Sequence, residues 1–405
     1  MVRCTLILLF FIMFVPGVIA SSIKDLINEQ SKISPNISIS IKNITKNKII
    51  VSHRNKARMT PASNQKILTT LTGLEFLGPK YKFLTHIYFI DSIDDSGVYN
   101  GNIYIDTKGD PTLTTKKIKK VVLFFKQKGM KEINGNIVIN NNYFEKPFYN
   151  KTWKSSWKGL SWAPYISSVA VDNNLYSKDQ TLYLTDNPLY LLGVIFKKQI
   201  KSHDIKFKGQ IKLKNISNLI KFNPKKTKYS IDSKELSELI YIINKQSNNL
   251  YAEHIFKKIS ANYFRKSGSW RDSQKIMRFF LNKKVKIDNS EFNIEDGSGL
   301  SKYNSVTTSS IINLLEYATK RDYFNDFYNS LPIAGLDGTL LKRFKLKPLY
   351  KNMRAKTGYI KGVSSLSGYF YGKNNDLYIF SIIVNDYNYS IRNFIEKILT
   401  KTYYL

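Results

Sequence analysis

Apolar residues change their spacing twice along this chain of 405 residues. Between residues 63 and 77 they recur every three or four positions, which predicts a helix. From residue 86 to about 234 they fall in short runs separated by Gly, Asn, Asp and Pro, which predicts strands and turns, with one helix near 116–128. Helical spacing then returns. We therefore expect an α+β domain, formed by residues 21–85 and 235–405, that is split by a long, mostly β insertion at 86–234, which could comprise two subdomains.

The two parts of the divided domain contain both strand and helix patterns. Isoleucines at positions 37, 39 and 41 alternate with polar residues, and the alternation resumes after a turn at 46–48, which predicts a hairpin. Helices are expected at residues 233–245, 250–264, 273–282 and 308–319. Three strands and a final helix are expected near the C-terminus, at residues 354–360, 364–371, 377–385 and 390–402.

Residues 1–20 have the three-part composition of a secretory signal peptide. Arg3 precedes an apolar run from Leu6 to Val15, and small residues come before a cleavage position at Ser21. The run is shorter than the ~20 residues that cross a membrane, which favours cleavage over an uncleaved anchor. Cys4 would leave with the peptide, and the absence of any thiol in the mature chain suits an oxidising compartment. We expect a secreted protein.

The chain carries a formal net charge of +33, from 63 Lys and Arg against 30 Asp and Glu. Clustered positive charge is typical of nucleic-acid binding, but here the basic residues are spread evenly, and 53 of the 63 are lysines. Arginine, whose planar fork recognises phosphates and bases, is scarce. The composition therefore favours a solvated basic surface over a polyanion site, although a secreted polyanion-binding protein stays open as an alternative.

Several kinds of catalytic site are missing from the sequence. One cysteine excludes a disulfide scaffold and a cysteine-cluster zinc site. The four histidines form no H-E-x-x-H motif, and neither a phosphate-binding loop nor a G-x-S-x-G turn is present. We expect no metal and no cofactor. If the protein is an enzyme, lysine is the favoured base.

A serine and a lysine three positions apart begin the first long predicted helix. Ser63 and Lys66 share one helix face, so the amine can reach the hydroxyl, and the helix N-terminus offers N–H groups to an oxyanion. The pattern S-x-x-K alone is weak, because it occurs three times in this chain. Ser63 could instead serve as the helix N-cap.

Two further motifs follow in a fixed order. Ser247 and Asn249 form S-x-N in a loop between two predicted helices, and Lys356-Thr357-Gly358 lies on a predicted strand. S-x-x-K, S-x-N and K-T-G together are the signature of penicillin-binding proteins and serine β-lactamases. Finding all three in order and in fitting structural contexts argues against coincidence.

On these motifs the chain resembles the class C low-molecular-mass penicillin-binding proteins, the D-alanyl-D-alanine carboxypeptidase/endopeptidase type 4 group. The resemblance covers nearly all of the mature chain and includes further segments at residues 109–113, 249–253, 296–301, 331–340 and 362–364. The interval of 184 residues from Ser63 to Ser247 is also typical of this group and is much longer than in compact β-lactamases. The resemblance implies a penicillin-binding, serine β-lactamase-like domain in which helices flank an antiparallel sheet.

The resemblance also implies a mechanism. Ser63 would attack the bond between two terminal D-alanines, or a D-alanine cross-link to a diamino acid, to form an acyl-enzyme. Lys66 would be the base, and Lys356, a second cation, would lower its pKa. Ser247 would pass a proton to the leaving amine, and Asn249 would bind the substrate backbone and hold Lys66. Thr357, Gly358 and Tyr359 would bind the substrate. The backbone N–H groups of Ser63 and Tyr359 would form the oxyanion hole.

The implied partners are peptidoglycan stem peptides and, as covalent inhibitors, β-lactams. The implied location is the periplasm or cell envelope, with peripheral association to an anionic envelope surface and without nucleic acid. A non-catalytic peptidoglycan-binding or scaffold module on the same fold is the alternative. The sequence predicts neither the oligomeric state nor a preference between carboxypeptidase and endopeptidase activity.

The chain departs from the family pattern at two places. Tyr359 follows K-T-G, where relatives often have Thr or Ser. The segment Trp153–Trp162 carries lysines where relatives often place an acid that faces the diamino acid of the stem peptide. Its tryptophans could line a groove, but the default interpretation for Trp is core packing. Ser298, in the Asp-Gly-Ser-Gly turn, we interpret as structural, because no base is identifiable beside it.

Overall fold

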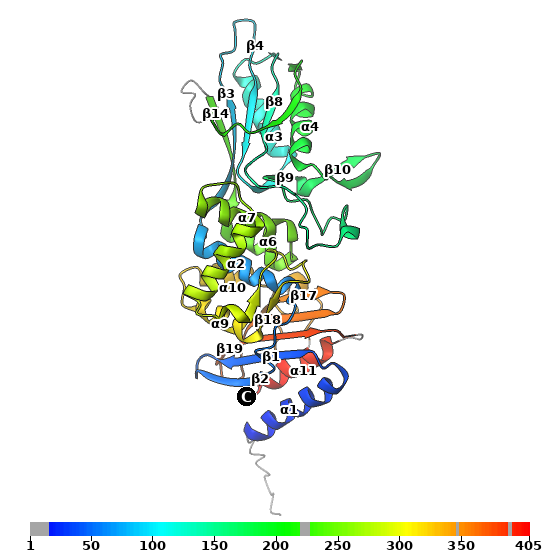
Figure 1. The fold of residues 1–405 in the computed structure, drawn as a ribbon, viewed down its shortest axis with the longest axis vertical. Helices are drawn as coiled ribbons and strands as arrows, with labels where there is room; N and C mark the ends of the chain where they lie inside the picture. The colour runs from blue at the N-terminus through cyan, green and yellow to red at the C-terminus, as the bar shows by residue number, and fades with distance from the viewer. Residues whose placement is uncertain (1–15, 219–226, 346–347, 388–390) are drawn as a thin grey trace, which may run out of the picture.

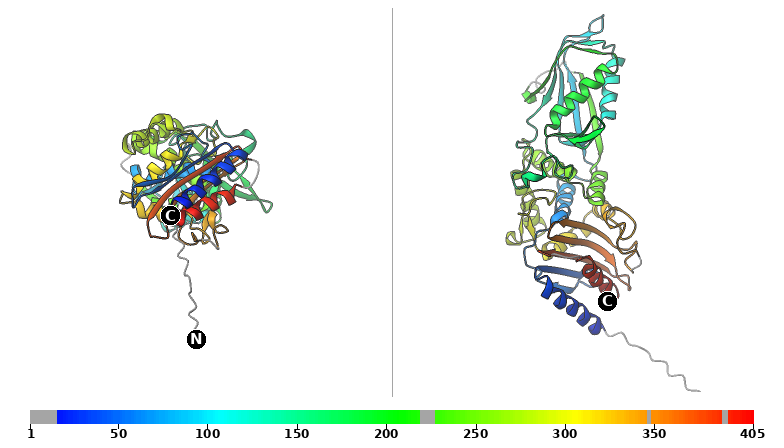
Figure 2. Two further views of the ribbon diagram at one scale, coloured as in Figure 1. Left: turned by 90° about the horizontal axis from the view of Figure 1, so that it is seen from below. Right: turned by 90° about the vertical axis from the view of Figure 1, so that its right-hand side faces the viewer.

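The computed structural model describes residues 16–218, 227–345, 348–387 and 391–405. Most of the predicted signal peptide, residues 1–15, lies outside them. Among the described residues, no helix combines the length and the apolar character needed to cross a membrane. The molecule is elongated, with residues 86–234 toward one end and a five-stranded sheet toward the other (Figures 1 and 2).

The five-stranded sheet that lies away from residues 86–234 combines strands from the two ends of the chain. Its strands are antiparallel in the order β17-β18-β19-β1-β2, so the expected N-terminal hairpin lies beside the three C-terminal strands. The bounds are β1 (Ile37–Asn43), β2 (Lys48–His53), β17 (Arg354–Ile360), β18 (Val363–Tyr371) and β19 (Leu377–Asn385). Both faces are buried, which explains the nearly continuous apolar run of β19. The α+β fold is confirmed.

Successive residues of β19 enter two different cores. Ile379 and Ile383 face the helical core, whereas Phe380 and Ile382 face the two terminal helices, as the two-residue period of a strand requires. The terminal helices are α1 (Pro16–Ile33) and α11 (Arg392–Tyr403). The helical core is built by α2 (Gln65–Leu77), α6 (Leu236–Gln246), α7 (Asn249–Phe264), α8 (Trp270–Phe279), α9 (Thr308–Thr319) and α10 (Phe324–Ser330).

The middle of the chain has its own sheet and its own apolar core. Its sheet has the order β13-β8-β5-β3-β14, and β3 pairs antiparallel with β14, so the chain enters and leaves the region side by side. The bounds are β3 (Lys82–Phe89), β5 (Ile103–Thr107), β8 (Ile137–Asn140), β13 (Ile211–Lys214) and β14 (Thr227–Glu235). On this basis we propose that residues 86–234 are a unit inserted into the surrounding domain.

Smaller elements complete this region. The short strands are β4 (Val98–Tyr99), β6 (Asp110–Leu113), β7 (Glu132–Ile133), β9 (Val169–Val171), β10 (Leu175–Lys178), β11 (Thr181–Leu184) and β12 (Lys206–Phe207). The expected helix near 116–128 is confirmed as α3 (Thr115–Gln127), but α4 (Pro188–Lys201) was not anticipated. Its Asn187 N-cap and Pro188 at the first turn are the signals that could have found it.

Two helices begin three residues away from their expected start. The helix expected from Ser273 begins at Trp270, after its N-cap Ser269. The helix expected from Ser233 begins at Leu236, because residues 227–235 extend strand β14. Ser233 stays in the strand, where its Oγ accepts a hydrogen bond from the Phe83 N–H of 2.9 Å. Pairing with β3 overrides the local helical pattern at this point.

Candidate active site

Ser63 lies in a short turn, η1 (Ala62–Asn64), directly before helix α2. Asn64, not Ser63, is the N-cap of α2, and no side chain caps that helix. The backbone of Ala62 has a φ of 47°, in the left-handed region that L-residues rarely adopt. Ser63 is therefore not a helix cap. The residue before it, Ala62, has a strained backbone that fixes the direction of the chain at Ser63.

The amine of Lys66 joins three parts of the chain. Lys66 is fully buried, and its Nζ lies 3.0 Å from Ser63 Oγ, 2.6 Å from Asn249 Oδ1 and 2.6 Å from the carbonyl oxygen of Ser298. A neutral amine has two N–H groups and one lone pair. With the N–H groups directed to Asn249 and Ser298, the lone pair can accept the Ser63 proton.

Burial lowers the pKa of Lys66 to about 7, while the carboxylates of Asp296 and Glu253 act in the opposite direction. A substantial fraction of this lysine is therefore neutral at neutral pH. Burial, and in second place the charge of Lys66, also lowers the pKa of Lys356 well below its usual value. Desolvation of the amine, instead of a neighbouring cation, is thus the main cause of the low Lys66 pKa.

Ser247 and Lys356 form a second serine–lysine pair beside the first. Ser247 is the C-cap of α6, in the left-handed conformation with a φ of 58°. Lys356 Nζ donates to Ser247 Oγ at 3.0 Å and to the Thr357 carbonyl at 2.8 Å. Asn249, at the start of α7, donates from Nδ2 to the Trp162 carbonyl at 2.6 Å. The fold therefore brings together all five residues that were predicted to be catalytic.

Strand β17 lies against the turn that carries Ser63. A Cβ atom on Gly358 would lie 3.0 Å from the Ser63 backbone nitrogen and 2.8 Å from the Pro61 oxygen, so only glycine allows this approach. Thr357 Oγ1 donates to Thr339 Oγ1 at 2.6 Å. Tyr359 is exposed. Strand β17 is an edge strand whose outer side pairs with Ile333 only at its first residue, Arg354, so an extended peptide could pair with its later residues.

Glu253 is a site residue that the motifs did not predict. It is fully buried, and its Oε1 accepts hydrogen bonds from the backbone N–H groups of Gly297 at 3.0 Å and Ser298 at 2.7 Å. Its Oε2 accepts from Trp270 Nε1 at 2.7 Å. Glu253 therefore orients the Ser298 carbonyl that Lys66 contacts. Its spacing of four from Asn249 places both on one face of α7, which is the signal that could have identified it.

Asp296 organises the turn on the other side of Lys66. Its carboxylate accepts from the N–H groups of Gly299 and Ser301, both at 2.7 Å, from Asn304 Nδ2 at 2.8 Å and from Trp153 Nε1 at 2.8 Å. Neither oxygen is left over for a reaction, which is consistent with a structural turn. Within the described part of the chain, Ser298 Oγ is buried and has no hydrogen-bond partner.

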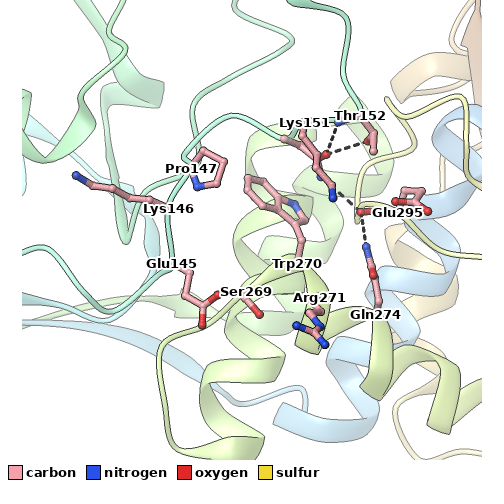
Figure 3. A pocket seen from close by; sticks show the side chains of 11 residues that line it. Glu145, Lys146, Pro147, Lys151, Thr152, Ser269, Trp270, Arg271, Gln274 and Glu295 are labelled. Carbon is pink, nitrogen blue, oxygen red and sulfur yellow. Dashed lines mark hydrogen bonds between the residues drawn. The ribbon is translucent and has the colours of Figure 1, made fainter.

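The tryptophans have different surroundings. Trp153 is buried, as the core interpretation expected, whereas Trp162 is 44% exposed and packs edge-on against Trp157. Trp270, which holds Glu253, also lines a polar pocket of about 320 Å³ with Glu145 (Figure 3). No group of three or more His, Cys, Asp or Glu side chains is placed to hold a metal ion among the residues that the structure describes.

Comparisons with known proteins confirm the family that the motifs indicated. The pattern of the D-Ala-D-Ala carboxypeptidase 3 (S13) family matches residues 19–183 and 177–401. The D-alanyl-D-alanine carboxypeptidase DacB of Haemophilus influenzae is 25% identical over 87% of this chain and 86% of its own length. The D-alanyl-D-alanine carboxypeptidase of an Actinomadura species is 23% identical over 82% of this chain and 74% of its own.

Solved structures share the fold. The crystal structure of penicillin-binding protein 4 of Haemophilus influenzae superimposes with a TM-score of 0.83 at 23% identity, over 95% of this chain and 99% of that one. A structure of that protein complexed with a β-lactam has a TM-score of 0.77 at 24% identity, over 95% and 100% of the two chains. A predatory endopeptidase of Bdellovibrio bacteriovorus has a TM-score of 0.60 at 15% identity, over 90% and 91%.

Proposed function

Because the chain belongs to the D-Ala-D-Ala carboxypeptidase 3 (S13) family of serine peptidases, we propose that its serine–lysine site cleaves peptidoglycan stem peptides through an acyl-enzyme on Ser63. The protein is a serine DD-peptidase with the fold of penicillin-binding protein 4. The single observation that supports the residue roles most directly is the 3.0 Å contact between Lys66 Nζ and Ser63 Oγ, made by a buried lysine whose pKa is about 7.

In the first half of the reaction, neutral Lys66 takes the proton of Ser63 Oγ as that oxygen bonds to the substrate carbonyl carbon. Collapse of the tetrahedral intermediate breaks the bond to the leaving nitrogen. That nitrogen receives a proton from Ser247, which Lys356 supports through its 3.0 Å contact. Ser247 regains a proton from the Lys66 ammonium, so the proton that left Ser63 ends on the leaving amine and Lys66 is neutral again. Water then hydrolyses the ester, with Lys66 again as the base. Asn249 keeps the Lys66 amine in place throughout.

The oxyanion would be held by the backbone N–H groups of Ser63 and Tyr359. Preorganised donors of this kind supply a large part of the catalysis in acyl transfer. The proximity of Gly358 to the Ser63 nitrogen supports this assignment, because it brings the two N–H groups to one place. Lys356 and Thr357 would bind the terminal carboxylate of the substrate.

Labelling with a fluorescent penicillin tests the role of Ser63. We expect one covalent adduct per chain in the wild type and none in Ser63→Ala, because the acyl bond forms on Ser63 Oγ. Ser155→Ala is a matched control, since Ser155 belongs to another S-x-x-K pattern and lies in a short turn, η2 (Ser155–Trp157). An adduct that persists in Ser63→Ala would contradict the assignment.

We also propose that the chain acts in the periplasm or cell envelope after removal of residues 1–20. The composition of those residues and the family of wall peptidases support this location. The net charge, +33 for the full chain and one less without Arg3, suits weak, peripheral contact with an anionic envelope surface. N-terminal sequencing of the exported protein would test the cleavage position before Ser21.

A further inference from the structure

A pocket of about 450 Å³ lies between strand β17 and the beginning of helix α11. Its lining includes Thr357, Gly358 and Tyr359, the three residues proposed to bind substrate, and Arg392. Thr339, in the short turn η6 (Gly338–Leu340), lines it as well and contacts Thr357 directly. The pocket is therefore continuous with the substrate strand.

Three cationic side chains line this pocket, and none of its lining residues is acidic. They are Lys342, Arg343 and Arg392; we call the site the cationic pocket. Lys342 and Arg392 are exposed. Two of the three are arginines, although arginine supplies only ten of the chain's 63 basic residues. The planar arginine fork matches the geometry of a carboxylate, which a lysine does not.

The charges in the cationic pocket are balanced only in part, by the carboxylate of Glu396. Arg343 Nε pairs with Glu396 Oε1 at 3.0 Å. The Nη2 atom of Arg343 is buried without a hydrogen-bond partner in the described part of the chain. Burial lowers the pKa of Arg343, the hydrogen bond and charge of Glu396 act in the opposite direction, and the positive charge of Arg392 lowers it again, so the two guanidinium groups repel one another. An added anion would relieve this repulsion.

The position of the pocket relative to Thr357 indicates which part of a substrate reaches it. Lys356 and Thr357 are proposed to hold the carboxylate of the leaving amino acid. A side chain or further peptide attached to that amino acid would then extend beyond Thr357, away from Ser63. The next residues on that path are Thr339 and Lys342. Ser63 lies at the other end of the path, beside Gly358. The cationic pocket is therefore a continuation of the leaving side of the site.

We propose that the cationic pocket binds a further carboxylate on the leaving segment of the substrate, so that the enzyme favours D-alanyl bonds whose leaving amine belongs to an acidic peptide. This inference rests on the proposed function and extends it. A single D-alanine has one carboxylate, which Thr357 would hold. The second stem peptide of a cross-link carries additional carboxylates, and these would occupy the cationic pocket.

Two synthetic peptides that differ only in the leaving residue test the proposal. One ends in D-Ala-D-Glu and the other in D-Ala-D-Gln, which has the same size without the charge. We expect kcat/KM of the wild type to be about five-fold higher for the D-Glu peptide, as one partly exposed charge pair provides. The ratio should fall toward one in Lys342→Gln/Arg392→Gln, mainly through KM, and also in high salt.

Lys397→Gln is the matched control, because Lys397 is an exposed cation on the same helix and does not line the pocket. It should keep the wild-type ratio. A wild-type ratio near one, or a raised ratio that persists in the double variant and in high salt, overturns the proposal. The proposal is also overturned if the Lys342→Gln/Arg392→Gln variant loses binding to isolated anionic envelope polymer but keeps the wild-type ratio of kcat/KM values. The cationic pocket would then bind that polymer and not the leaving segment. The proposed function fails separately, if the wild type forms no penicillin adduct and cleaves neither peptide.

Discussion

Lys66 is placed between effects that shift its pKa in opposite directions. Burial favours the neutral amine, while the buried carboxylates of Glu253 and Asp296 favour the charged ammonium, and the result is a pKa of about 7. Burial also raises the pKa of Glu253 to about 7. A general base works best with a pKa near the operating pH. The second layer of residues around Ser63 therefore sets the reactivity of its base.

Glu253→Gln should shift the pH profile of acylation. Without the Glu253 charge the pKa of Lys66 falls, so the neutral form persists at lower pH. We expect the acidic limb of the labelled-penicillin acylation rate to move down by less than about one pH unit, because Glu253, with a pKa of about 7, is itself partly protonated there. The plateau rate should fall because Gln cannot accept from Trp270 and Ser298 together. Rates measured from pH 5 to 9 would show this.

The control for this change is Glu295→Gln, a nearby carboxylate whose Oε1 accepts a hydrogen bond from Asn293 Nδ2 at 3.0 Å. Its acidic limb should stay in place. A Glu253→Gln variant that loses rate equally at every pH, with no shift of the limb, would show that Glu253 supports the turn without tuning Lys66.

At the scale of elements, the site depends on how closely β17 approaches η1. A Cβ on Gly358 would lie 2.2 Å from Ser365 Oγ, and Ser365 Oγ itself donates to the Pro61 oxygen at 2.7 Å. The same contact that ties the Ser63 turn to the sheet therefore excludes a side chain at Gly358. The Ser365–Pro61 contact does not follow from the period of the strand, because it joins segments about 300 residues apart in the chain.

Gly358→Ala should separate β17 from the Ser63 turn. Overpacking of this kind costs about 1–3 kcal/mol of stability, and the displaced oxyanion donor should slow acylation by ~100-fold. Ser365→Ala removes the nearest obstructing atom, so the double variant should regain part of the lost rate compared with Gly358→Ala. Melting temperature and penicillin acylation measure the two effects. An acylation rate unchanged in Gly358→Ala would argue against an oxyanion hole at this strand.

At the scale of the whole molecule, buried amines lie where residues 86–234 meet helix α7. Lys257 Nζ donates to the Glu145 carbonyl at 2.8 Å and lies 4.3 Å from the centre of the Trp270 ring. Lys258 contacts the Tyr143 hydroxyl. Burial lowers the pKa of each of these lysines to about 7. We therefore expect the contact between residues 86–234 and helix α7 to depend on pH.

Lys257→Met should flatten the dependence of stability on pH. The folded-state pKa of about 7 lies below the unfolded value near 10.4, so between these pH values the unfolded chain binds more protons and stability rises with pH. Removing Lys257 should lower that slope by up to about 1.4 kcal/mol per pH unit. Urea unfolding from pH 7 to 10 measures it. The exposed Lys151→Met is the control, and an equal slope in both variants would contradict the prediction.

The sequence by itself determined the order of the three motifs, the helix that follows Ser63 and the α+β character of the chain. These features are local, because a serine and a lysine three positions apart share a helix face wherever the helix lies. The tertiary structure decided the rest. Lys66 and the Ser298 carbonyl are 232 residues apart, so their contact depends on how the chain folds back.

The same reason explains the other residues that the motifs did not include. Glu253 acts through the backbone of a turn 45 residues further along the chain, and Asp296, within that turn, is held by the distant Trp153. The cationic pocket combines residues of η6 and α11. Burial, which gives Lys66 its low pKa, is a property of the assembled core and cannot be derived from spacing along one helix. The sequence identified the reacting groups, and the tertiary structure supplied the environment that makes them reactive.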